Sequence, residues 1–399
     1  MNKKTVRDLG DAELRGRRAL VRVDFNVPLD DRRQVTDDTR IQAALPTLRY
    51  LIEHGARVVL LSHLGRPKGA PDPEYSLQPV QRRLAELLPG TRVDFCETTD
   101  TDEALKASEH LGDGQVLVLE NTRFLAGEEA NDERLARELA RLGDLYVNDA
   151  FGAAHRAHAS TEGVARVLHP AVAGLLMERE LAYLGRALAR PERPFVAVLG
   201  GAKISGKMDV IEQLLPKVDH LLVGGAMACT FFRAMGLETG KSLVEADRVD
   251  MARGVLERAG GKLVLPDDAL VAAELTAGAP ARAVPREAIP PDQAMFDVGP
   301  ATVARFGELV RSARTVLWNG PMGVFETPPF DAGTLGVARA LADATAAGAT
   351  TIVGGGDSAA AIAQAGLDSQ VTHVSTGGGA SLEFLEGKAL PGVDALDDA

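Results

Sequence analysis

Short runs of Val, Leu, Ile and Phe recur along the whole chain and alternate with stretches rich in alanine and leucine. The runs lack apolar-polar alternation, which is typical of parallel strands that helices cover on both faces. The expected strands are 19–27, 57–63, 92–97, 115–121, 145–151, 195–201, 220–225, 262–267, 293–299, 315–320, 350–356 and 371–376. This pattern predicts a doubly wound α/β fold.

The expected strands fall into two groups, one before residue 152 and one after residue 194. A helical segment, roughly 173–190, lies between them, and Pro191 and Pro194 follow it. A chain of 399 residues is long enough for two cores. We therefore expect a first domain over 1–172, an interdomain helix over 173–190 and a second domain from 191 onward.

The composition narrows the class of protein. Apolar residues make up 45% and charged residues 25% of the chain, as in globular proteins. The net charge of −12 argues against nucleic acid or an anionic membrane as the main partner. Cys96 and Cys229 stand far apart without metal-type spacing, which suits a reducing compartment. No signal segment or membrane-length apolar run is evident, so we expect a cytoplasmic protein.

Two stretches near the C-terminus, 350–358 and 371–381, combine a predicted strand, three glycines and a helix start. Glycines permit positive φ and keep Cβ atoms away from a ligand, while a helix N-terminus offers unpaired N–H groups. For any single glycine pair, a tight strand-to-helix connection with glycine chosen for packing is the better explanation. Two neighbouring turns, with Gly200-Gly201 and Gly224-Gly225 ending earlier strands, favour a polyphosphate ligand.

Residues 201–207 match the first part of a P-loop, but Met208 stands where Ser or Thr should bind Mg²⁺. The strict P-loop interpretation therefore fails. Lys203 and Lys207 are four residues apart, and we expect them on one helical face, where an anion would relieve their repulsion. Two solvated surface lysines are the plainer alternative, but the position directly after Gly200-Gly201 at a strand end favours phosphate.

Asp357 follows the first triple glycine and precedes Ser358 at a predicted helix start. An N-cap is the plain interpretation, and a single carboxylate beside a phosphate turn also suits Mg²⁺. Gly354, Gly356 and Ala359 fit the loose dinucleotide fingerprint, which raises an NAD-dependent dehydrogenase as an alternative. The next strand ends without the acidic residue that binds ribose, so this alternative is distant.

The first half places basic residues just after predicted strands. Three arginines, Arg66, Arg123 and Arg156, follow strand ends directly or through a short turn. A guanidinium group can bind one phosphate or carboxylate through two parallel hydrogen bonds. Any single arginine is more commonly a surface charge. His155 and His158 have a spacing that could suggest a metal, but no third ligand stands nearby, and anion contact or loop packing suits them better.

The chain resembles the phosphoglycerate kinase family along essentially its whole length. The motifs that carry the resemblance are Arg22-Val23-Asp24-Phe25-Asn26-Val27-Pro28, Ser62-His63-Leu64-Gly65-Arg66-Pro67, Leu199-Gly200-Gly201-Ala202-Lys203, Trp318-Asn319-Gly320-Pro321-Met322-Gly323-Val324-Phe325-Glu326, Gly355-Gly356-Asp357-Ser358 and the segments 147–152, 154–158 and 375–383. Their order along the chain also fits. The resemblance implies two Rossmann-like lobes, each a parallel β-sheet core flanked by helices, with nucleotide on 191–385 and the segment 386–399 packing back on the first domain.

The resemblance also implies the site residues. Phosphoglycerate is expected on the first lobe, at Asp24, Phe25, Asn26, Arg40, His63, Leu64, Gly65, Arg66, Arg123 and Arg156. ATP or ADP with Mg²⁺ is expected on the second, at Gly201, Lys203, Lys207, Met295, Phe296, Asn319, Glu326, Gly354, Gly355, Gly356, Asp357 and Ser358, with Asp357 on the metal. The phosphoryl group in transfer is expected among Arg40, Lys203, Gly355 and Gly378, with Gly379 in the same turn.

Met295 and Phe296 depart from the family pattern, because relatives often carry glycine and leucine beside the adenine there. The implied reaction is reversible phosphoryl transfer between 1,3-bisphosphoglycerate and MgADP. Because the two substrates are expected on different lobes, the lobes must close, and since no coiled-coil seam is evident we expect a monomer. A noncatalytic nucleotide-binding protein is a further alternative, since it needs the glycine turns but not Lys203 or the arginines.

Overall fold

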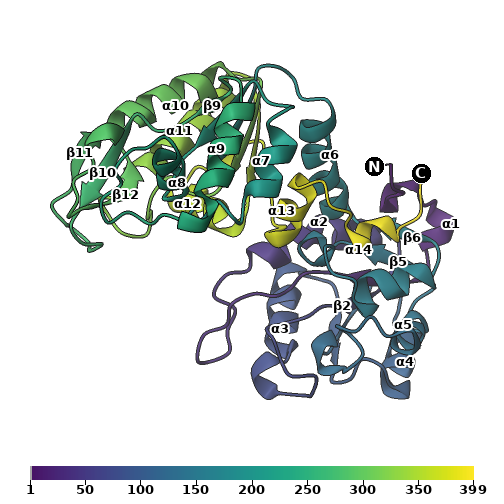
Figure 1. Ribbon diagram of the computed structural model, residues 1–399. Helices are drawn as coiled ribbons and strands as arrows, with labels where there is room; N and C mark the ends of the chain where they lie inside the picture. The colour runs from purple at the N-terminus through teal and green to yellow at the C-terminus, as the bar shows by residue number, and fades with distance from the viewer. Residues whose placement is uncertain (1) are drawn as a thin grey trace. The chain divides into compact units, whose positions relative to one another are not determined.

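The structure is a computed structural model that describes residues 2–399. The chain forms two compact units, one running up to Ala182 with Ala389–Ala399 added, and one over Tyr183–Lys388 (Figure 1). Each unit contains a six-stranded sheet in which all paired strands run parallel. The predicted fold class, two parallel sheets flanked by helices, is confirmed.

The sheet of the first unit has the order β3-β4-β2-β1-β5-β6. Its strands are β1 Arg18–Arg22, β2 Arg57–Leu61, β3 Val93–Cys96, β4 Val116–Leu119, β5 Leu145–Asn148 and β6 Ala171–Ala173. Its helices are α1 Asp11–Leu14, α2 Thr39–Glu53, α3 Gln78–Leu87, α4 Asp102–Glu109, α5 Glu133–Ala140 and α14 Pro391–Asp394, and a π-helical turn covers Ala159–Gly163.

The main sheet of the second unit has the order β15-β14-β13-β7-β8-β9. Its strands are β7 Phe195–Leu199, β8 His220–Val223, β9 Leu263–Val264, β13 Thr315–Asn319, β14 Thr350–Gly354 and β15 His373–Val374. A separate sheet, β11-β10-β12, is formed by β10 Asp268–Ala272, β11 Arg282–Pro285 and β12 Ala294–Val298. The helices are α7 Met208–Leu214, α8 Met227–Ala234, α9 Val249–Arg258, α10 Pro300–Ser312, α11 Ala332–Ala346, α12 Gly356–Gln364 and α13 Gly379–Leu385. Helix α6, Leu175–Ala189, contains the boundary between the units.

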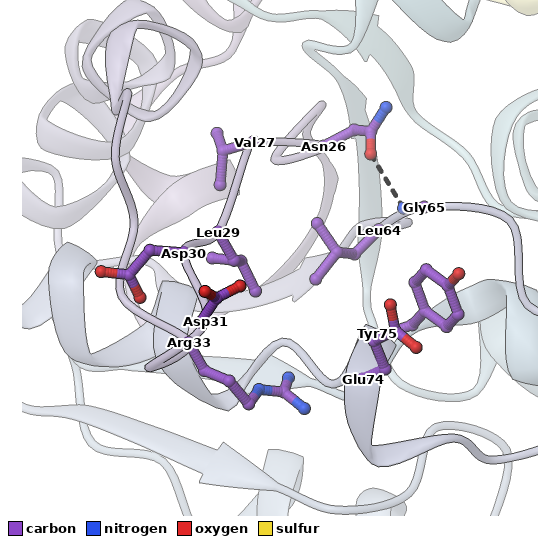
Figure 2. Close-up of a pocket in the computed structure, with 10 residues that line it drawn as sticks. All are labelled: Asn26, Val27, Leu29, Asp30, Asp31, Arg33, Leu64, Gly65, Glu74 and Tyr75. Atoms are coloured by element: carbon purple, nitrogen blue, oxygen red, sulfur yellow. Dashed lines mark hydrogen bonds between the residues drawn. The ribbon is translucent and has the colours of Figure 1, made fainter.

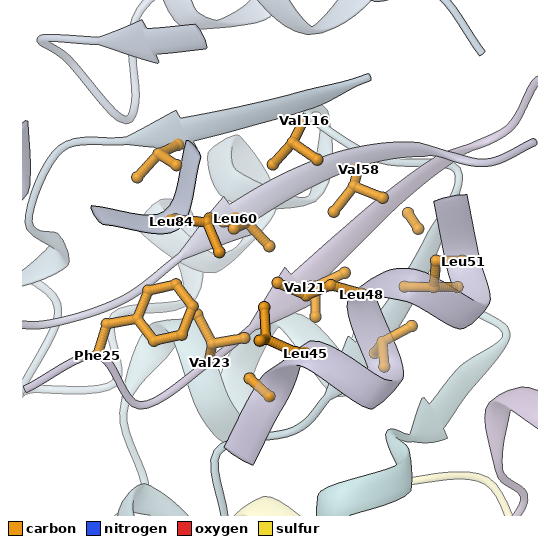
Figure 3. Packing of buried hydrophobic residues seen from close by; sticks show 14 of the residues in the cluster. Val21, Val23, Phe25, Leu45, Leu48, Leu51, Val58, Leu60, Leu84 and Val116 are labelled. Atoms are coloured by element: carbon orange, nitrogen blue, oxygen red, sulfur yellow. The ribbon is translucent and has the colours of Figure 1, made fainter. Parts of the chain in front are cut away.

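The core of the first unit forms where α2 packs on the sheet (Figure 3). Leu45, Leu48 and Leu51 recur at helical spacing and are buried, as are Val21 and Val58 on the strands. Burial of side chains of this size stabilises a fold by about 1.5–3 kcal/mol each. This packing holds the strand ends, and the loops that leave them, in fixed positions.

The C-terminal segment belongs to the first unit. Lys4 donates its backbone N–H to Asp397 O over 2.9 Å, and Asn148 Nδ2 donates to Gly392 O over 2.9 Å. Leu390 is fully buried. The segment thus completes the unit that the N-terminal residues begin.

The sequence pattern missed three strands and the direction of a fourth. Strand β6 is too short to show a period, and β11 is mostly exposed and ends in Pro285. Strand β10 begins at Asp268, only four residues after β9 ends, and its short apolar stretch was not recognised as a separate strand. The segment 293–299 was expected among parallel strands, but β12 pairs antiparallel with β10. An apolar run reports burial and carries no information on strand direction.

Among the described residues, no helix combines the length and apolar character needed to cross a membrane.

Candidate functional site

The polar residues of the first unit lie where its parallel strands end. Asp24 and Asn26 follow β1, His63 and Arg66 follow β2, and Arg123 follows β4. Parallel strands place their carboxyl ends along one edge of the sheet, which is where ligands bind in this class of fold. The topology of the sheet is therefore compatible with the prediction that residues at these strand ends bind the substrate.

Arg40 lies in the first turn of α2 and donates from Nη1 to Asp24 Oδ2 over 2.8 Å. Burial alone would raise the pKa of Asp24, but the nearby guanidinium groups of Arg40 and Arg22 and the backbone N–H of Asn26 hold it below its ordinary value. Asn26 contributes a backbone N–H at 3.3 Å from Asp24 Oδ1. Asp24 is therefore an ionised carboxylate, and in this form it orients the Arg40 side chain.

Asn26, Gly65 and Arg123 are joined directly. Asn26 Oδ1 accepts from Gly65 N over 2.8 Å, and Arg123 Nη1 donates to Gly65 O over 2.6 Å. Arg123 is only 5% exposed, and burial lowers its pKa. Phe25 and Leu64 are buried beside these residues and support the loops rather than offer polar groups.

The remaining predicted residues of this unit are less enclosed. Arg66 is exposed, and Arg156 donates from Nε to His155 Nε2 over 3.1 Å. A hollow of about 610 Å³ borders the site at Asn26, Leu64 and Gly65 (Figure 2). Its other side is the loop that contains Leu29.

In the second unit, a hollow of about 240 Å³ gathers most of the predicted phosphate residues. Its lining is Lys207, Asn319, Gly320, Gly355, Gly356, Asp357, Ser358, Gly378, Gly379 and Leu382. These residues come from the ends of β13, β14 and β15 and from the starts of α7, α12 and α13. Both glycine turns predicted from the sequence thus open into one hollow.

Lys207 is the cation of this hollow. Its Nζ donates to Asn319 Oδ1, and burial lowers its pKa to about 8, against the opposing charges of Asp357 and Glu386. Ser358 is buried, and its Oγ accepts from Gly320 N over 2.5 Å, so it supports the turn from behind. Asp357 is exposed in the first turn of α12. The arrangement offers one cation, one carboxylate and backbone N–H groups to an anion.

The backbone of the turns requires glycine at particular positions. Gly355 has φ 89° and Gly378 has φ 52°, conformations that side chains strain. A Cβ on Gly200, at the end of β7, would lie 2.0 Å from Pro321 O. Glycine at 200 therefore lets the two strand-end loops approach one another.

The prediction that Lys203 and Lys207 share a helical face is wrong. Helix α7 begins at Met208, Lys207 is its N-cap residue, and Lys203 lies in the irregular segment between β7 and the helix. Lys203 is exposed, whereas Lys207 is partly buried. Glycines between β7 and the helix delay the helix start, because glycine disfavours helical structure.

The other residues predicted for nucleotide lie outside the 240 Å³ hollow. Gly201 follows β7, Gly354 ends β14, and Glu326 is exposed in the loop after β13. Met295 is 3% exposed, with its sulfur 3.6 Å from Cys229 Sγ. Phe296 is partly buried and lies 5.1 Å, between ring centroids, from Phe330.

Glu128 and Ser160 were missed by sequence reasoning. Both are fully buried and hydrogen-bonded to each other next to Arg22. Glu128 stands in a polar stretch that reads as surface, and Ser160 follows a histidine-rich turn, so no local pattern distinguishes either residue.

Within residues 2–399, no group of three or more His, Cys, Asp and Glu side chains is arranged to hold a metal ion. Asp357 alone fits Mg²⁺ that arrives with a nucleotide, because that ion takes one or two carboxylates and completes its shell with phosphate oxygens and water.

Two α/β units, one with arginine and histidine at its strand ends and one with a lysine and two glycine turns, define an enzyme of the phosphate-transferring class. Comparison with known proteins agrees. The family model described as phosphoglycerate kinase matches residues 9–388. A phosphoglycerate kinase of Chloroflexus aggregans is 60% identical over the full length of both chains, and one of Chlorobium limicola is 57% identical over the same extent.

Solved structures lead to the same family. The phosphoglycerate kinase of Coxiella burnetii superposes with a TM-score of 0.89 at 44% identity, and that of Pyrococcus horikoshii with 0.85 at 34%, each covering 98% of both chains. The chain belongs to the phosphoglycerate kinase family, so it is a kinase. The dehydrogenase alternative raised by Gly354 and Gly356 is not supported.

Proposed function

We propose that the chain catalyses reversible phosphoryl transfer from 1,3-bisphosphoglycerate to MgADP, which gives 3-phosphoglycerate and MgATP in glycolysis. The observation that carries the proposal is that the two units have different polar groups at their strand ends. Guanidinium and imidazole groups line strand ends in one unit, and a lysine with two glycine turns lines a hollow in the other.

Phosphoglycerate would bind the first unit. Arg123 and Asn26 are fixed by Gly65, and Arg40 is oriented by Asp24, so these groups need little reorganisation to meet a charged ligand. Arg66 is exposed, which suits a group that pairs with the ligand's phosphate.

The nucleotide would bind the second unit. Lys207 and the N–H groups at the glycine turns would hold its phosphates, and Asp357 would hold the Mg²⁺ that neutralises them. Glu326 is proposed near the ribose, and Met295 and Phe296 near the adenine. Because Met295 is almost fully buried, Phe296 offers the larger accessible surface of the two.

The chemistry needs no general base, because the carboxylate that attacks phosphorus is ionised at neutral pH. The protein's task is alignment and charge stabilisation, which we assign to Arg40, Lys203 and the turns at Gly355 and Gly378. Since the two substrates are assigned to different units, transfer requires the units to close during the reaction and exclude water.

A coupled assay with 3-phosphoglycerate and MgATP tests the activity, and ADP formation that requires both substrates is expected. The variant Arg66→Ala tests the assignment of substrates to units. It should weaken 3-phosphoglycerate binding and leave the Kd for MgADP unchanged. Equal weakening of both ligands contradicts the assignment.

The proposed enzyme acts in the cytoplasm as a monomer, without nucleic acid or membrane as partner. The net charge of −12 supports the proposal that neither nucleic acid nor an anionic membrane is a partner, because a negatively charged protein repels polyanions. Size-exclusion chromatography with light scattering checks the oligomeric state.

A further inference from the structure

Arg22 is a buried cation beside the phosphoglycerate residues of the first unit. It ends β1, it is 1% exposed, and its guanidinium makes three contacts. Nε donates to Ser160 Oγ over 2.8 Å, Nη1 donates to Val23 O, and Nη2 lies 3.1 Å from His63 Nδ1. A charge this deep is retained only where partners satisfy it.

The contact with His63 determines which ring nitrogen carries the proton. A guanidinium has only donors and stays protonated, so Nδ1 of His63 must accept. A neutral imidazole that accepts at Nδ1 carries its proton on Nε2. His63 is 6% exposed, so little water can reach the ring to replace Arg22 as the hydrogen-bond partner of Nδ1.

Ser160 connects Arg22 to Glu128. The hydroxyl of Ser160 accepts from Arg22 and donates to Glu128 Oε1 over 2.5 Å, while Ser160 N donates to Glu128 Oε2 over 2.9 Å. Tyr146 donates its hydroxyl to Ser160 O over 2.9 Å and so fixes the backbone of the π-helical turn. Both oxygens of the Glu128 carboxylate therefore act as acceptors, and its charge faces the buried guanidinium through one hydroxyl.

We propose that Glu128 acts through Ser160 and Arg22 to hold His63 as the neutral tautomer with its proton on Nε2, and that Glu128 is thereby a positioning residue of the phosphoglycerate site. The chemical reason concerns the ligand, whose carboxylate and phosphate oxygens only accept hydrogen bonds. Nδ1 is turned to Arg22, so Nε2 is the ring nitrogen left for a ligand. The other tautomer would present a lone pair to an anion.

The charges around His63 favour the neutral ring. Burial holds its pKa well below the ordinary value, Asp24 opposes this, and the guanidinium groups of Arg22, Arg123 and Arg40 add to it. We therefore expect His63 to remain neutral across the pH range in which a free histidine titrates.

Nitrogen-15 NMR of the full-length wild-type protein tests the tautomer directly. The His63 signals are identified by their loss in His63→Gln. The expected result is an acceptor shift at Nδ1 and a protonated Nε2, unchanged between about pH 5.5 and 8. A protonated Nδ1, or a ring that becomes cationic in this range, overturns the proposal without any other variant.

Three variants test the role of Glu128. Glu128→Gln replaces one acceptor by a donor and removes one of the two carboxylates near Arg22, leaving Asp24, and Ser160→Ala removes the bridge while keeping the Glu128 charge. Glu162→Gln is the matched control, because Glu162 lies in the same turn, is largely buried and bonds Asn131 and Arg166 instead of Ser160.

Glu128→Gln and Ser160→Ala should each change the His63 tautomer populations and weaken 3-phosphoglycerate binding by about tenfold, the loss of roughly one charge-assisted hydrogen bond. The Kd for MgADP should be unchanged in both, and Glu162→Gln should resemble wild type in every readout. If Ser160→Ala has the same His63 NMR signals and the same affinity for 3-phosphoglycerate as the wild-type protein, the proposal is overturned. This holds even where Glu128→Gln does not fold.

The binding part of this inference depends on the proposed function, and the two fail separately. Absence of kinase activity and of 3-phosphoglycerate binding in the wild-type protein contradicts the proposed function. A wrong tautomer in an active wild-type enzyme contradicts only the role given to Glu128.

Discussion

Arg40 Nη1 lies 2.8 Å from Asp24 Oδ2, which joins the first turn of α2 to the loop after β1. The Arg40 side chain is 37% exposed and that of Asp24 is 11% exposed, so a carboxylate from within the unit holds a guanidinium that still faces outward. A bond of this kind presets a flexible side chain and reduces the entropy that it loses on binding.

Arg40→Ala should lower kcat by at least about a hundredfold, because the donor that we propose for the transferring group is lost, while the Kd for MgADP stays constant. Arg40→Lys is the matched control, since it keeps the charge without the planar pair of donors, and it should recover only part of the loss. Steady-state kinetics with equilibrium binding checks both variants. Near-wild-type turnover in Arg40→Ala removes this residue from the catalytic assignment.

Lys207 should make nucleotide binding sensitive to alkaline pH. Burial lowers its pKa to about 8, so the free protein loses this charge as the pH rises through that value. Nucleotide phosphates are already ionised there, and the Kd for MgADP should rise by up to about tenfold between pH 7.5 and 9. Calorimetric titration across this range measures the effect. The variant Lys207→Arg keeps its charge and should flatten the profile, and an equal slope in that variant contradicts the assignment.

Asp297 should make the second unit less stable as the pH rises. It is fully buried and accepts from Gly333 N over 2.7 Å, and burial raises its pKa to about 7 from 3.8. The folded state therefore holds a proton that the unfolded state has released, and the free energy of unfolding falls by up to about 1.4 kcal/mol per pH unit between pH 4 and 7.

The fluorescence of Trp318, the single tryptophan of the chain, reports unfolding of this unit. Denaturant unfolding of wild type and Asp297→Asn at several pH values measures the effect. In Asp297→Asn the free energy of unfolding should fall less steeply with rising pH than in the wild-type protein. An equal pH dependence in the two proteins contradicts the role of Asp297.

The C-terminal segment should stabilise the first unit. Leu390 is fully buried, and its replacement by alanine should cost about 2–5 kcal/mol through lost burial and a cavity. Thermal unfolding followed by circular dichroism, with Trp318 fluorescence as a report on the second unit, measures where the loss falls. Asp398→Ala, which removes only an exposed partner of Lys3, should change little. A loss confined to the second unit contradicts the docking of this segment.

Most of the main strands were predictable because burial on both faces leaves an apolar run in the sequence. The glycine turns were predictable because positive φ at Gly355 and Gly378 requires a residue without a side chain. The small sheet was less predictable, since β10 and β11 pair through backbone groups that every residue carries. The delayed start of α7 separated Lys203 from Lys207, which helical spacing alone did not reveal.

The sequence by itself determined the class of fold, the order of its motifs and the residue types available for phosphate, because local conformation and burial depend on residues that lie close together in the chain. Only the tertiary structure decided that Glu128 and Ser160 stand behind Arg22 and His63, and that Lys207 loses solvent next to Asn319. Desolvation and hydrogen-bond partnership depend on residues far apart in the chain, and folding alone brings those residues together.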